Sequence, residues 1–122
     1  MNKRGFTLIE LLVVMAILAT LLTLAVPRYF QHLERSREAV LRENLAVVRD
    51  AIDKYHADRG TWPESLADLA DKRYLRTIPM DPITESRETW QIVPPPEGGS
   101  GIYDVHSGAQ GTASDGTPYA EW

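Results

Sequence analysis

Apolar and polar positions divide the chain into one long apolar stretch and a mixed remainder. Residues 6–26 read FTLIELLVVMAILATLLTLAV and contain a single charged side chain, that of Glu10. A helix rises about 1.5 Å per residue, so this stretch would cover about 30 Å, the thickness of the hydrocarbon core of a membrane. The pattern therefore predicts a helix long enough to span a membrane.

The residues that flank this stretch predict its orientation. Lys3 and Arg4 precede it, and such basic residues favour the cytoplasmic side, which places the chain after Pro27 on the opposite side. Two simpler interpretations stay open: a secretory signal cut near residues 23–25, and a plain single-pass anchor. The plain anchor leaves Glu10 unexplained, because an acid at the centre of a membrane helix costs about 2.5–3.5 kcal/mol.

Beyond Pro27 the pattern becomes amphipathic, which predicts a kinked helix that continues and does not end there. Its apolar face recurs at spacings of three and four residues: Leu41, Leu45, Val48, Ile52 and Tyr55. The charged positions Glu34, Arg35, Glu38 and Arg42 are interpreted as a solvated face. The helix should end near Asp58, with Gly60 as the left-handed residue after it.

The last half of the chain predicts a small α+β head. Residues 66–74 form a short amphipathic helix, preceded by Thr61 and Glu64 at capping-box spacing. Residues 89–93 and 102–106 are β-prone and should pair antiparallel, with the prolines between them as a spacer. The run 107–118 is rich in Gly, Ser, Thr and Ala and is predicted to lie outside the core.

Composition limits the chemistry that the chain can perform. The net charge of −4 argues against a nucleic-acid-binding surface, and the absence of cysteine excludes a disulfide. Asp104, His106 and Ser107 are residue types of a catalytic triad, but neighbours along a strand face opposite sides and cannot form its relay. The three histidines have no metal-ligand spacing. We therefore expect no enzyme activity and no required cofactor.

Two separate motifs carry a resemblance to a known family. Residues 3–14, KRGFTLIELLVV, resemble the class III signal of type IV pilins and of the pseudopilins of type II secretion systems. Residues 74–75, Tyr-Leu, followed by Pro-Met-Asp-Pro at 79–82, are similar to the body of the major pseudopilins. The resemblance implies that a membrane prepilin peptidase cuts between Gly5 and Phe6 and methylates the new amino group of Phe6.

The resemblance also implies an architecture and a role. The fold class would be α+β of the type IV pilin-like kind, with a leader at 1–5, a transmembrane or filament-core helix at 6–27, an amphipathic continuation at 28–58 and a periplasmic head at 59–122. The chain would be a structural pseudopilin of the bacterial inner membrane that polymerises into a filament driving type II secretion. The absence of a disulfide favours secretion over a type IV pilus subunit, which stays an alternative along with the plain anchor.

The expected partners follow from that role: other copies of the chain, minor pseudopilins, the prepilin peptidase, the inner-membrane assembly platform and, before assembly, lipid. Glu10 has no basic partner between residues 6 and 26, so we expect its carboxylate to pair with the freed Phe6 amine of a neighbouring subunit. In the resembling family, the proline corresponding to Pro27 borders a segment that can unwind during assembly.

The carboxyl-terminal loop contains the chain's cluster of hard oxygen donors. Asp104, Ser107 and Asp115 together with backbone carbonyls suit calcium, and major pseudopilins carry a calcium site in this loop. Those proteins commonly have an aspartate where Gln110 falls here. An alternative interpretation makes Asp104 a strand-end cap and Asp115 part of a turn.

Overall fold

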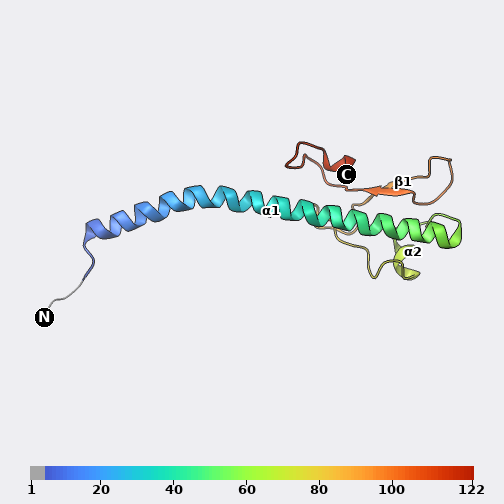
Figure 1. Ribbon diagram of the computed structural model, residues 1–122, viewed down its shortest axis with the longest axis horizontal. Coiled ribbons are helices and arrows are strands. Elements are labelled where there is room, and N and C mark those ends of the chain that lie inside the picture. The colour runs from blue at the N-terminus through green and yellow to red at the C-terminus, as the bar shows by residue number, and fades with distance from the viewer. Residues whose placement is uncertain (1–4) are drawn as a thin grey trace. The chain divides into compact units, whose positions relative to one another are not determined.

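The computed structural model describes residues 5–122, so Lys3, Arg4 and most of the predicted leader lie outside the described residues. The elements follow in the order α1 (Leu8–Arg59), α2 (Leu66–Asp71), β1 (Gln91–Val93), β2 (Asp104–His106) and the 3-10 helix η1 (Tyr119–Glu121). Figure 1 labels α1, α2 and β1. The fold is α+β, as predicted. Its contacts form two compact units, Met1–Glu34 and Arg35–Trp122, each described separately below.

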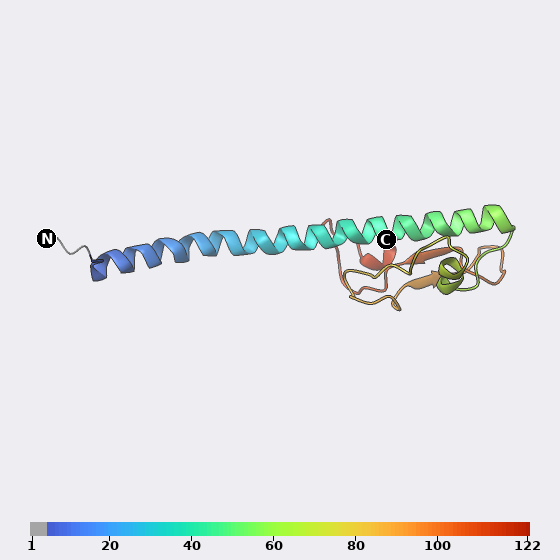
Figure 2. The ribbon, with the colours of Figure 1, turned by 90° about the horizontal axis from the view of Figure 1, so that it is seen from below.

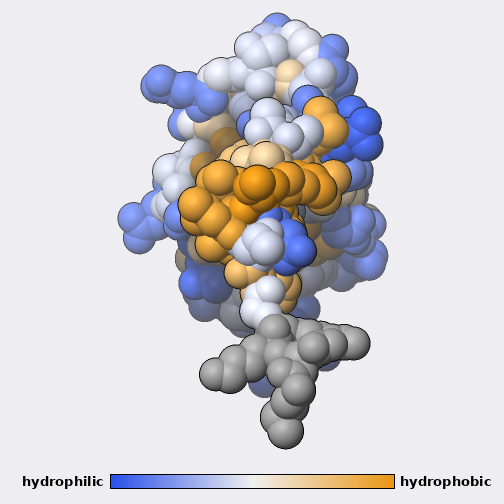
Figure 3. Space-filling model, turned by 90° about the vertical axis from the view of Figure 1, so that its left-hand side faces the viewer, coloured by the Kyte–Doolittle hydropathy of each residue, from blue (hydrophilic) through white to orange (hydrophobic). Residues whose placement is uncertain are grey.

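The first unit contains the apolar part of α1. Every residue from 5 to 32 is exposed, and apolar side chains gather on the surface seen in Figure 3. The hydroxyls of Thr20 and Thr23 donate to the carbonyls of Ala16 and Ala19 at 2.8 Å, so these polar groups are satisfied within the helix. Within the described residues, α1 is the one helix long and apolar enough to cross a membrane.

α1 continues through Pro27, so the expectation that the helix does not end at this residue is confirmed. Proline has no N–H group to donate to the carbonyl four residues earlier, which leaves one helical hydrogen bond unmade.

The carboxyl-terminal part of α1 forms one side of the hydrophobic core of the second unit. All five residues of the predicted apolar face are buried, together with Ala51. Figure 2 shows the rest of the head packed against this part of α1. The helix ends at Arg59, where the Gly60 N–H donates to the His56 carbonyl at 2.8 Å and Gly60 has φ of 73°. The predicted end with a left-handed glycine is therefore confirmed.

The second helix begins later than its predicted cap. α2 starts at Leu66, and its cap is Ser65, whose hydroxyl accepts from the Asp68 N–H at 3.2 Å. The expected capping box at Thr61 and Glu64 is wrong, because Pro63 disfavours helical geometry in the residue before it. Leu69, fully buried, fixes α2 on the core.

β1 and β2 form a two-stranded antiparallel sheet, as predicted, in which Ile92 pairs with Val105. The prediction that residues 107–118 lie outside the core is wrong, because Ser107, Ala109 and Ala113 are buried. Their small side chains allow the loop to follow the surface of the core closely. A Cβ atom on Gly108 would lie 1.9 Å from the Thr89 carbonyl oxygen, so this close approach requires glycine.

Candidate functional site

The predicted cleavage junction lies in front of the helix. Residues 5–7 are not helical, and α1 begins only at Leu8. Phe6 is 90 % exposed, and a Cβ atom added to Gly5 would meet no heavy atom within 4 Å. Gly5 and Phe6 are therefore exposed and lie outside the helix, so a peptidase could reach the bond between them without unwinding α1.

Glu10 has a local role that the sequence reasoning missed. Its backbone N–H donates to the Thr7 hydroxyl at 3.1 Å, and the Thr7 N–H donates to Oε2 of Glu10 at 3.3 Å. This reciprocal pair is a capping box at the start of α1. The Thr-x-x-Glu spacing before an apolar run was the signal that could have revealed it. Oε1 of Glu10 has no hydrogen-bond partner within residues 5–122, so the carboxylate keeps capacity for a further contact.

The three residues predicted to bind calcium are held in separate networks. Oδ1 of Asp104 accepts from Arg49 at 2.8 Å and from the Val105 N–H at 2.7 Å. The buried Ser107 hydroxyl donates to Asp81 at 2.5 Å. Asp104 thus has the geometry of the strand-end cap that the alternative interpretation described.

The Asp115 carboxylate is held by Thr117 of its own turn and by Arg42 of α1. Oδ1 of Asp115 accepts from the N–H and the hydroxyl of Thr117, at 3.0 and 2.6 Å, and Oδ2 accepts from Arg42 at 3.1 Å. Hydrogen bonds from Thr117 and the nearby Arg42 guanidinium together hold the pKa of Asp115 below its ordinary value, despite an opposing effect of desolvation.

The donor set as it stands does not fit a calcium ion. Among residues 5–122, no group of three or more His, Cys, Asp or Glu side chains is placed to hold a metal ion. Asp104 and Asp115 already face arginines, and the Ser107 oxygen is buried against another carboxylate. Calcium binding by these residues stays a prediction that would require the loop to rearrange.

Glu38 joins α1 to the loop through three hydrogen bonds. Its Oε1 accepts from the Ser114 N–H at 2.7 Å and from the Tyr119 hydroxyl at 3.1 Å, and its Oε2 accepts from the Ser114 hydroxyl at 2.6 Å. Glu38 is 8 % exposed, so its expected place on a solvated face is wrong. The expectation treated the helix alone, whereas the donors come from residues 76 and 81 positions later.

The charge of Glu38 is stabilised despite its burial. Burial raises the pKa of this carboxyl, but the hydrogen bonds from Ser114 and Tyr119 outweigh it and leave the pKa below its ordinary value; the nearby Asp115 acts in the raising direction. A surface hollow of about 500 Å³ beside it is lined by Arg35, Glu38, Ala39, Arg42, Glu43, Ser114 and Asp115.

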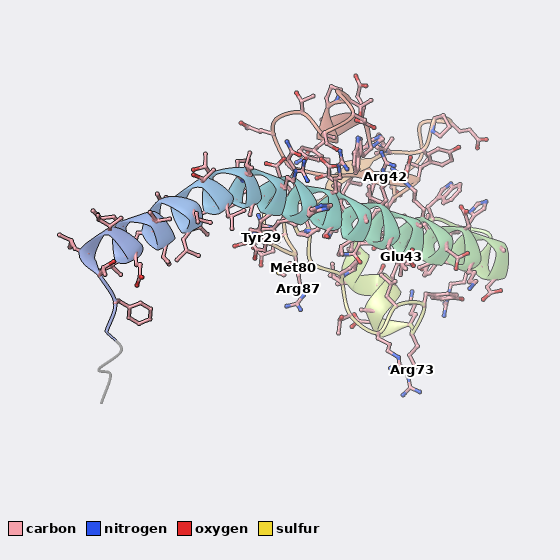
Figure 4. All side chains as sticks on the ribbon, turned by 60° about the vertical axis from the view of Figure 1, so that its left-hand side comes forward. Tyr29, Arg42, Glu43, Arg73, Met80 and Arg87 are labelled. Carbon is pink, nitrogen blue, oxygen red and sulfur yellow. The ribbon has the colours of Figure 1, made fainter. Side chains whose placement is uncertain are left out.

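Two arginines extend this junction along α1. Arg42, one turn after Glu38, pairs with Asp115, and its Cζ atom lies 4.3 Å from the Trp122 ring centre. Figure 4 shows Arg42 on the part of α1 that packs against the head. Arg49 donates to Asp104, to the Val105 carbonyl at 2.9 Å and to the Trp122 carbonyl at 2.6 Å. Glu38, Arg42 and Arg49 thus line one edge of the buried helix face.

Comparison with known proteins identifies a motif at the start of the chain. The family model for the prokaryotic N-terminal methylation motif matches residues 1–26. The chain carries this motif. Its matched span includes the open Gly5–Phe6 junction and the Thr7–Glu10 capping box, and it stops one residue before Pro27.

Similarity to individual proteins extends beyond the motif. The chain is 25 % identical over 120 residues to the fimbrial protein EcpC of Eikenella corrodens, covering 94 % of this chain and 78 % of that protein. It is 29 % identical over 134 residues to the type II secretion system core protein G of Escherichia coli K12, covering 93 % and 89 %. The type IV major pilin protein PilE1 of Neisseria gonorrhoeae is 37 % identical over 65 residues, 52 % of this chain and 38 % of the pilin.

These similarities confirm the resemblance to type IV pilin-like proteins and to the core protein of type II secretion. No solved structure matches the chain. The comparisons concern the motif and the chain as a whole, so the assigned roles of Gly5, Phe6, Glu10 and Pro27 stay predictions.

Proposed function

We propose that this chain is a structural subunit that polymerises into a periplasmic pilus-like filament and drives protein export by type II secretion. The carrying observation is the methylation motif in residues 1–26, joined to similarity over almost the whole chain to type II secretion core protein G. Because the relatives are filament and secretion subunits by name, the role is structural and not enzymatic.

Processing is the first step of this proposal. A prepilin peptidase cuts between Gly5 and Phe6 and methylates the new amino group. The exposed, non-helical junction supports this step, since a protease can reach the scissile bond without unwinding α1. Mass spectrometry of the chain purified from membranes should give a mature form that begins with N-methylated Phe6. An intact Met1, or a cut near Ala25 that releases a soluble head, would contradict it.

Membrane insertion and assembly use the same apolar surface. The exposed side chains of residues 6–26 face lipid before assembly, with the amino end cytoplasmic and the head periplasmic. In the filament they pack against other copies. Minor pseudopilins and the inner-membrane assembly platform are the further partners that this role requires.

Glu10 has two tasks in the proposed assembly. Within one subunit it closes the capping box with Thr7. Between subunits its carboxylate pairs with the Phe6 amine of a neighbour, which removes two unpaired charges from the apolar filament core and sets the axial register. The two contacts can form together, because the capping bond uses Oε2 and leaves Oε1 for the neighbouring amine.

A type IV pilus subunit is the second candidate, favoured by the similarity to EcpC over 94 % of the chain. Deletion of the gene in its own bacterium separates the two functions. Loss of exported proteins from the medium, with their accumulation in the periplasm and restoration by the wild-type gene, supports secretion. Loss of surface pili or twitching with normal export supports the pilus instead.

A further inference from the structure

We propose that Glu38 of α1 holds the carboxyl-terminal loop in place without a metal ion. The loop segment concerned is the turn at residues 113–117. Inside it, the Ala113 N–H donates to the Thr117 carbonyl at 2.8 Å, and the Gly116 N–H donates to the Ala113 carbonyl at 3.0 Å. These bonds shape the turn but do not attach it to the helix.

Attachment to α1 comes from side chains of the helix. Glu38 accepts both the N–H and the hydroxyl of Ser114, and also the hydroxyl of the buried Tyr119. Hydrogen bonds to an ionised carboxylate are about twice as strong as neutral ones. Because Glu38 is buried, solvent competes little for these donors, so the carboxylate fixes both the turn and the segment after it.

The charge balance around the loop removes the need for a cation. A calcium site gathers carboxylates that would otherwise repel one another, and its ion supplies the compensating charge. Here Arg42 faces Asp115 and Arg49 faces Asp104, at 3.1 and 2.8 Å. The buried carboxylates of Glu38 and Asp81 accept hydrogen bonds from neutral donors. The loop's anions are thus compensated by the chain's own groups.

Hydrogen exchange of the full-length chain in detergent tests the proposal. The peptide covering residues 110–122 should exchange at the same slow rate with millimolar calcium chloride and with a calcium chelator. Glu38→Gln should accelerate its exchange about tenfold or more in both conditions, as expected when a charged hydrogen-bond acceptor is lost. The measurement uses the unassembled subunit, so its outcome is separate from filament formation or secretion.

Glu43→Gln is the matched control, because Glu43 lies on the same helix and lines the same hollow but is exposed. It should leave the exchange rate unchanged. Ser114→Ala removes one donor and keeps the Glu38 charge, so it should give an intermediate rate and serves if Glu38→Gln does not fold. A wild-type loop that is slow only in calcium overturns the proposal, as does Glu38→Gln or Ser114→Ala exchange at the wild-type rate.

Discussion

Replacement of Glu10 by glutamine separates its two proposed tasks. A glutamine at this position still accepts the Thr7 N–H, because either Glu or Gln completes a capping box. The start of α1 should therefore survive in Glu10→Gln, and membrane insertion should become easier, since no charge enters the apolar phase. What the variant loses is the charge that would pair with the Phe6 amine of a neighbouring subunit.

The expected magnitudes of the two effects differ enough to distinguish them. Breaking a buried ion pair and leaving one charge costs about 3–5 kcal/mol, which corresponds to a loss of about a hundredfold to several thousandfold in subunit affinity. Thr7→Ala removes the other side of the capping box and keeps the charge. Loss of a helix cap costs about 0.5–2 kcal/mol, and at this helix end the loss affects one subunit and not the pairing. We therefore expect Glu10→Gln to abolish filaments and Thr7→Ala to reduce them modestly.

The assay compares wild type, Glu10→Gln and Thr7→Ala in cells that contain the native prepilin peptidase and assembly machinery. Mass spectrometry first establishes that all three chains are cut and methylated equally. Filaments are then sheared from the cells and quantified by immunoblot. Normal filament levels for Glu10→Gln would refute the pairing role and leave Glu10 as a recognition mark for the machinery. Equal failure of Thr7→Ala would show that the helix start, and not the charge, controls assembly.

Three further predictions concern the head. Gly108→Ala should lower the free energy of unfolding by about 1–3 kcal/mol or more, because its Cβ would meet the Thr89 carbonyl oxygen; circular dichroism in detergent would record this as a lower Tm. Gly99→Ala is the control, and it should stay within about 0.5 kcal/mol of wild type because a Cβ there meets nothing within 4 Å. The folded state lowers the pKa of Glu38, so the contribution of this group to stability is full at neutral pH and is lost as the pH falls through that lowered value. Below about pH 5, the Tm of Glu38→Gln should therefore fall less steeply with pH than the Tm of wild type. The Tm should be equal in calcium and in chelator, whereas a higher Tm in calcium that Asp115→Ala removes would restore the metal site.

The sequence predicted the elements that depend on local periodicity. Leu41, Leu45 and Val48 recur with the helical period, so their common buried face was predictable. The paired strands and the left-handed Gly60 were also predictable, because the alternation of a strand and the residue preferences of a turn depend on only a few neighbouring residues.

The junction between α1 and the loop was not predictable in this way. The burial of Glu38 depends on donors 76 and 81 residues away, and nothing in the charge pattern of the helix distinguishes it from the exposed Glu34. Ser107 and Ala109 were misplaced because a segment of small residues usually lacks the apolar area to form core. Here the close passage of Gly108 past Thr89 brings those small side chains inside.

The two buried carboxylates explain how a head of this size holds its loops without a disulfide. A small domain buries a modest apolar core and usually needs an additional constraint. Asp81, fully buried, accepts from the N–H groups of Ile83 and Thr84 and from the Ser107 hydroxyl, so it ties the proline-rich loop to the end of β2. Glu38 ties the following turn to α1. Each carboxylate accepts at least one hydrogen bond from a distant segment, so removing either one leaves donors there unpaired, which is the costly way to lose a hydrogen bond. The resulting constraint is long-range, as a disulfide would be, and at Glu38 it weakens in acid, because the folded state lowers the pKa of that carboxyl.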